Sequence, residues 1–146
     1  MAEKPYLAAA FLCERVLQEK DGVLSAIRII DTYSVSIPKN LPEDAKATIQ
    51  ITALLAFKKA SPGTEAEKHQ ITLQLFAPSG PQPPQSIDVF FNQQAELDGF
   101  NLITGMSVAV AEFGLFWLHV FIDGEPATRI PFRLLLKEEE TPKMIH

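Results

Sequence analysis

Histidine and cysteine are the side chains that most often act as bases, nucleophiles or metal ligands near neutral pH. This chain has three histidines, His69, His119 and His146, and one cysteine, Cys13. None of them stands at a metal-ligand spacing from another histidine, cysteine or acid. His119 falls inside an expected strand, where a packed or partly exposed ring is the favoured interpretation over a ligand or a base.

The remaining nucleophile and phosphate motifs are also missing from the sequence. Only Arg15 stands near Cys13 to lower its pKa, so we interpret Cys13 as a small buried hydrophobe. The serines form no Gly-x-Ser-x-Gly turn, and the glycines are scattered singly, without a phosphate loop. The paired acids fall in an expected loop, Glu43-Asp44, and in the C-terminal tail. We therefore expect no enzyme and no catalytic, cofactor-binding or metal-binding residue, unless the fold assembles one.

Length and charge limit the classes of protein that this chain could be. Its 146 residues are enough for one core, and we expect a single domain over residues 1–137 with an acidic, flexible tail over 138–146. Eighteen acids against thirteen bases give a net charge of −5, without the basic stripe that a nucleic-acid binder needs. Nucleic acid is therefore not an expected partner.

The N-terminal run YLAAAFLC superficially resembles a lipoprotein signal that ends at its cysteine. Its apolar part is short for a signal peptide, and bulky Leu12 stands where a small residue is required before Cys13. A single cysteine also permits no disulfide within the chain, which suits a reducing compartment. With no apolar run long enough to cross a membrane, the expected location is the cytoplasm.

Alternation of apolar and polar residues predicts strands along most of the chain. The clearest case is Ala47–Lys58, where Ile49, Ile51, Ala53, Leu55 and Phe57 occupy every second position. Proline-rich loops are expected at Pro38–Asp44 and Pro78–Pro84, the second of them extended and unpaired, and a bulge or bend at Gly105. About eight strands result: Tyr6–Gln18, Val23–Val35, Ala47–Lys58, His69–Ala77, Gln85–Gln93, Phe100–Val110, Leu115–Ile122 and Thr128–Leu136.

The last two of these strands form the strongest local prediction, a hairpin that turns at Asp123-Gly124. Asp-Gly accepts the positive φ angles of a tight hairpin turn. The preceding residues Glu112–Leu118 have the spacing of the corner before a core strand in immunoglobulin-like domains, with Phe116 in place of the usual tyrosine. Short strands, regular turns and no convincing helix predict an all-β, antiparallel two-sheet sandwich, immunoglobulin-like in style.

Two stretches of the chain carry a resemblance to a known family. They are FLCERVLQEKDGVLSAIRIIDTY near the start and EFGLFWLHVFIDGEPATRIPFRL near the end. Both resemble a bacterial family of small uncharacterised β-sandwich proteins, classified only as a domain of unknown function. The resemblance implies a sandwich fold and a bacterial origin, and it brings no activity and no site residues.

The strand Leu115–Ile122 is apolar on both faces, whereas a sandwich strand normally buries one face and exposes the other. Phe116, Leu118, Val120 and Ile122 share one face, and Leu115, Trp117, His119 and Phe121 share the other. One interpretation is that a loop or a short helical segment covers the second face. The alternative is that these four residues form an exposed interaction face, which would make the protein a homodimer or a partner-binding protein.

Two functions from different classes follow from these patterns. The leading hypothesis is a non-catalytic protein-binding or assembly module whose expected partner is a second copy. The alternative is a small-molecule or glycan-binding sandwich, even a hydrolytic one, with its site on the proline loops. Convergent polar groups in a pocket near those loops or Trp117 would favour the alternative, and a flat apolar sheet face would favour the first.

Overall fold

The structure, a computed structural model, describes residues 5–36, 48–59, 67–91, 98–109 and 112–137. Within these residues the fold is all-β, as the sequence predicts. The strands are β1 (Tyr6–Gln18), β2 (Leu24–Ile29), β3 (Thr32–Val35), β4 (Thr48–Lys59), β5 (Glu67–Ala77), β6 (Gly80–Pro81), β7 (Gln85–Phe91), β8 (Asp98–Ala109), β9 (Gly114–Ile122) and β10 (Glu125–Leu136).

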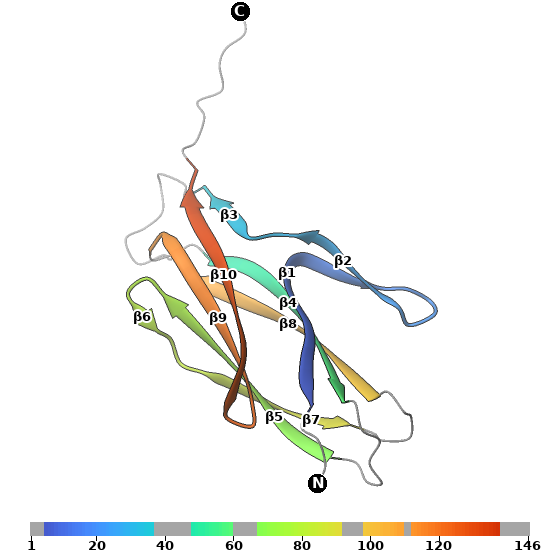
Figure 1. Ribbon diagram of the computed structural model, residues 1–146. Coiled ribbons are helices and arrows are strands. Elements are labelled where there is room, and N and C mark those ends of the chain that lie inside the picture. Colours follow the sequence, from blue (N-terminus) through green and yellow to red (C-terminus); the bar gives the residue numbers. More distant parts are fainter. Residues whose placement is uncertain (1–4, 37–47, 60–66, 92–97, 110–111, 138–146) are drawn as a thin grey trace, which may run out of the picture.

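The strands form two sheets that face each other as a sandwich (Figure 1). The four-stranded sheet has the order β2-β1-β4-β8, and the six-stranded sheet has the order β3-β10-β9-β5-β6, with β7 also paired to β5. Neighbouring strands are antiparallel except β3, which lies parallel to β10. The predicted hairpin is therefore the middle of the larger sheet.

Alternate residues of both sheets meet between them and make one core. From β4, Ile51, Ala53, Leu55 and Phe57 are fully buried. From the hairpin, the rings of Phe116 and Phe132 stack with centroids 5.3 Å apart and planes 18° apart. The face of β9 predicted to point inward does so, since Phe116, Leu118, Val120 and Ile122 are all buried. Burial of these alternating side chains is the main force that holds the two sheets together.

The single strand predicted over Val23–Val35 is wrong, because the structure divides it between the two sheets. β2 pairs with β1, whereas β3 pairs with β10. Ile30 and Asp31 lie between the two strands, and the Asp31 carbonyl accepts a hydrogen bond from the N–H of Arg133. The positive φ of Arg28, +53°, distorts the end of β2, and the chain crosses to the other sheet after Ile29.

Two smaller expectations also differ from the structure. The loop Pro78–Pro84 is not wholly unpaired, since Gly80 and Pro81 turn back along β5 as β6. No bulge occurs at Gly105, which pairs in continuous register with Thr52. The loop Pro38–Asp44 and the tail 138–146 lie outside the described residues. In the part of the chain that is described, no helix has the length and hydropathy to cross a membrane.

The turn between β9 and β10 is fixed by its own residues and by β5. Asp123 has a φ of +49° and Gly124 a φ of +81°, as a two-residue turn of this twist requires. Gln70 bonds to Asp123 through its backbone: its carbonyl accepts from the Asp123 N–H at 2.8 Å, and its own N–H donates to Asp123 Oδ1 at 2.8 Å. Asp123 Oδ2 lies 2.6 Å from Nδ1 of His69. One carboxylate thus ties the tip of the hairpin to the next strand.

These contacts predict the effect of replacing Asp123. Asp123→Ala should lower the free energy of unfolding by about 1–3 kcal/mol, because it removes the side-chain contacts with Gln70 and His69 and the polar side chain that favours a positive φ. Asp123→Asn, which tolerates this φ and keeps an acceptor, should lose clearly less. Urea unfolding of the three proteins measures the difference, and an alanine variant as stable as the wild type would contradict this account of the turn.

Candidate functional site

The four residues predicted as an interaction face lie together on the outer side of the six-stranded sheet. Leu115, Trp117, His119 and Phe121 alternate with the buried residues of β9, so all four point away from the core. Leu115 is 42% exposed, and the other three are half-buried. Because β9 lies in the middle of its sheet, its backbone is paired on both sides and only side chains are offered to a partner.

Strand β5 adds a residue that the sequence pattern did not reveal. The register sets Phe76 opposite Trp117 and Gln74 opposite His119. The rings of Phe76 and His119 lie 4.1 Å apart at 36°, and the His119 ring lies 6.2 Å from that of Phe121. His119 is therefore packed between aromatic neighbours, in agreement with its interpretation as a strand residue.

Strand β10 supplies a cation to the same surface. The guanidinium carbon of Arg129 lies 4.7 Å from the centre of the Trp117 ring, a cation–π contact. Arg129 is exposed, as are Pro131 opposite Trp117 and Arg133 opposite Leu115. We call Phe76, Leu115, Trp117, His119, Phe121 and Arg129 the aromatic face.

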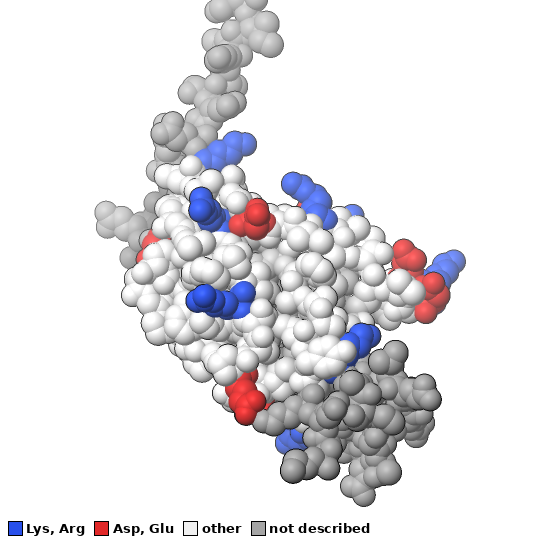
Figure 2. Space-filling model, in the orientation of Figure 1, with Lys and Arg blue, Asp and Glu red and all other residues white. Residues whose placement is uncertain are grey.

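The aromatic face is directed to solvent within the described part of the chain. That part contains no helix that could cover it, and Leu115 and Arg129 reach the surface. In Figure 1 the six-stranded sheet lies nearer to the viewer than the paler β4 and β8. Figure 2 shows the same side as mostly uncharged, with scattered basic and acidic groups. A broad, weakly charged aromatic surface with arginine has the composition of the central residues of protein interfaces.

The other residues considered for chemistry are separated by the fold. His69 lies at the hairpin tip with Asp123, and Cys13 is buried in β1. Burial raises the pKa of the Cys13 thiol above its ordinary value, so the thiolate that a nucleophile requires is disfavoured. Among the described residues, no three His, Cys, Asp or Glu side chains lie close enough to hold a metal ion.

Tyr33 is a buried polar group close to Cys13. Its ring meets that of Phe132 edge-on, with centroids 5.9 Å apart, and its hydroxyl has no hydrogen-bond partner among the described residues. Burial, with a smaller contribution from the charge of Cys13, raises the pKa of Tyr33 to about 12. A buried hydroxyl of this kind lowers the free energy of unfolding, because the hydrogen bonds that it makes to water in the unfolded chain are not replaced in the folded one.

Comparison with known proteins gives a family and a fold. The model of a family of unknown function, DUF6941, matches residues 8–135. No curated protein matches the chain significantly. Among solved structures, the chain is similar to the Pseudomonas fluorescens alkylpurine DNA glycosylase AlkC bound to DNA containing an abasic site analog, with a TM-score of 0.54 and 8% identity. The match covers 90% of this chain and 30% of the glycosylase chain, so this chain spans less than a third of that protein. At this identity the likeness shows the fold alone.

The environment of Tyr33 predicts a pH effect on stability. As the pH rises, the unfolded chain releases the tyrosine proton first, near pH 10, whereas the folded chain keeps it to about pH 12. The free energy of unfolding should therefore fall between these two values, and Tyr33→Phe should remove this part of the fall without loss of stability at neutral pH. Urea unfolding of both proteins from pH 7 to pH 11.5 (about one half unit below the folded pKa) tests it, and parallel curves would refute it.

Proposed function

The chain belongs to the DUF6941 family, a family of unknown function, and we propose that it is a non-catalytic protein-binding or assembly module that forms a homodimer through the aromatic face. The single observation that carries the proposal is the outward position of Leu115, Trp117, His119 and Phe121 on the middle strand of the larger sheet. The bacterial origin and cytoplasmic location expected from the sequence belong to the same proposal.

The geometry of the face suits association through side chains. All its rings lie on one side of β5 and β9, and the His119 ring already lies beside the rings of Phe76 and Phe121. Arg129 is held over Trp117, so its side chain is partly ordered before any partner arrives. Such pre-ordering lowers the conformational entropy that binding costs.

A two-fold arrangement also agrees with the charges on the face. If the two-fold axis runs along β9, strand β10 of one copy lies over β5 of the other. Arg129 then lies over the uncharged Gln74 of β5, because both residues are level with His119, instead of over Arg129 of the second copy. Arg133 is level with Leu115, beyond the residues of β5 that pair with β9. Like charges stay apart, which is a requirement for a specific interface.

The alternative, a small-molecule or glycan site on the proline loops, has less support. A cleft does lie beside Pro83, and the amides of Gln82 and Gln85 line it. However, its other lining residues are mostly leucine, methionine and valine, which offer no hydrogen bonds to a sugar. Ser107 is the one further polar side chain among its described lining residues, and none of those residues is charged or aromatic.

Light scattering coupled to size-exclusion chromatography tests the proposal on the wild type, on Leu115→Glu and on Trp117→Ala/Phe121→Glu. We expect a wild-type dimer at tens of micromolar and folded monomers for both variants, since a buried charge or a lost anchor should weaken association by about thirtyfold or more. Circular dichroism confirms that the variants remain folded.

Phe11→Glu is the matched control for this experiment. Phe11 is 39% exposed on β1 of the other sheet, so the same kind of substitution there should leave the dimer intact. A monomeric wild type would refute the homodimer. If the wild type is a monomer and Trp117→Ala/Phe121→Glu unfolds it, Trp117 and Phe121 contribute to the stability of the fold and not to an interface.

A further inference from the structure

We propose that β8 and the cleft beside it accept an extended, uncharged peptide strand from a partner protein. This strand would pair with the free edge of β8 and insert alternate apolar side chains between the two sheets. β8 and β3 lie on opposite sides of the sandwich. The β8 edge is separate from the aromatic face, so peptide binding there does not depend on a dimer through that face.

The first observation is that β8 is an edge strand in the described part of the four-stranded sheet. β8 is the last strand of the four-stranded sheet, and it pairs with β4 along its whole length in unbroken register. Over Leu102–Val108, the described residues place no strand on its other side. In an edge strand, every second residue directs its N–H and C=O away from the sheet, so this segment offers a row of unpaired backbone groups.

The second observation is that the sequence does not protect this edge. Natural proteins guard long edges with lysine, proline or bulges that prevent pairing with another chain. β8 contains no proline and no basic residue, and its one charged residue is Asp98 at the very start. On the outward face of β8, Gly105, Ser107 and Ala109 are small, whereas Ile103 is large and 45% exposed.

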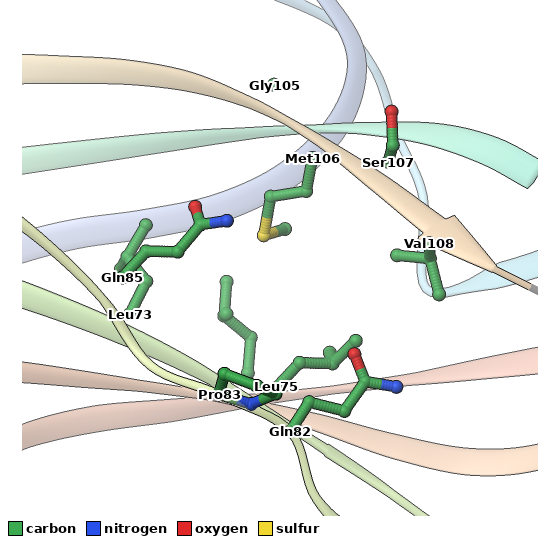
Figure 3. A pocket seen from close by; sticks show the side chains of 10 residues that line it. Leu73, Leu75, Gln82, Pro83, Gln85, Gly105, Met106, Ser107 and Val108 are labelled. Atoms are coloured by element: carbon green, nitrogen blue, oxygen red, sulfur yellow. The ribbon is translucent and has the colours of Figure 1, made fainter.

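The third observation is the cleft itself, which has a volume of about 330 Å³. It lies between β8 on one wall and β5 with the β6–β7 connection on the other (Figure 3). In Figure 3, Met106 and Val108 face Leu73, Leu75 and Gln85 across the opening. None of the described residues that line it is charged. The cleft reaches the buried side chains of Leu73, Val108 and Leu118 directly beside the edge of β8.

These observations together select the occupant. A free strand edge is satisfied only by another extended backbone, which is the basis of peptide recognition by strand addition. An acyl chain could enter the cleft, but it would leave the N–H and C=O groups of β8 without partners. A second copy could pair through its own β8, but the inward side chains of that strand already pack against its own second sheet. The uncharged walls call for an uncharged peptide, because a buried unpaired charge is costly.

A designed peptide tests this inference. The probe is an acetylated, amidated and fluorescently labelled peptide. Its uncharged central segment, the part expected to pair with β8, alternates valine and threonine, and one lysine at each end outside that segment keeps it soluble. Its control has the same composition, with the valines in one block and the threonines in another. We expect saturable anisotropy with the alternating peptide only, and slower amide hydrogen exchange over Leu102–Val108 when it is bound.

Two single substitutions test whether the alternating peptide binds in the cleft. Gln85→Glu places a charge on an exposed residue that lines the cleft, and it should weaken peptide binding about tenfold or more while the fold is kept. Gln18→Glu makes the same change at an exposed position of β1 and should leave binding unchanged.

Three results would overturn the proposal. In the first, the protein binds the alternating peptide and the block control equally well. In the second, it binds the alternating peptide, but hydrogen exchange over Leu102–Val108 is not slowed or Gln85→Glu does not weaken the binding. The third is binding of dodecanoate, but not of the alternating peptide, in a manner sensitive to Gln85→Glu, which would make the cleft an acyl-chain site.

Discussion

The register of β9 between β10 and β5 is the constraint on which the structure depends. Side chains along a strand alternate between faces, so a slip of one residue would exchange the two sides of β9. Phe116, Leu118 and Val120 would then be exposed, and Trp117 and His119 would enter the core. Two devices prevent this: the tight turn at Asp123-Gly124 fixes β9 against β10, and the contacts of Asp123 with Gln70 and His69 fix it against β5.

The core and the aromatic face are therefore two consequences of one pairing. Stacking of Phe116 on Phe132 inside the sandwich requires the same register that sets Phe76 beside His119 and Arg129 over Trp117 outside it. Because β9 is paired on both sides, the side chains that it presents outward stand on a backbone held by two neighbouring strands. This combination suits a surface that must keep its shape for a partner.

The two sides of the sandwich differ in a way that matters for binding. On one side the chain itself crosses between the sheets, since β2 belongs to one and β3 to the other. On the other side β8 ends its sheet, and a cleft separates it from β5 and the β6–β7 connection. The aromatic face presents side chains to solvent, whereas β8 presents the edge of a sheet. The likeness to part of a DNA glycosylase at 8% identity is a likeness of fold, and a shared fold of this kind carries no function with it.

The sequence by itself determined the local features of this protein. Alternation along Ala47–Lys58 and along β9 established which residues face inward, and Asp-Gly established the hairpin turn, because both effects act between close neighbours in the chain. The four residues of β9 in the candidate site followed from the same alternation. Tertiary structure alone decided which strands are neighbours. It brought Phe76 and Arg129 to the aromatic face, divided Val23–Val35 between two sheets and left β8 at an edge. Strand order depends on pairings between segments far apart in the chain, and a period of two residues contains no information about which strand lies alongside.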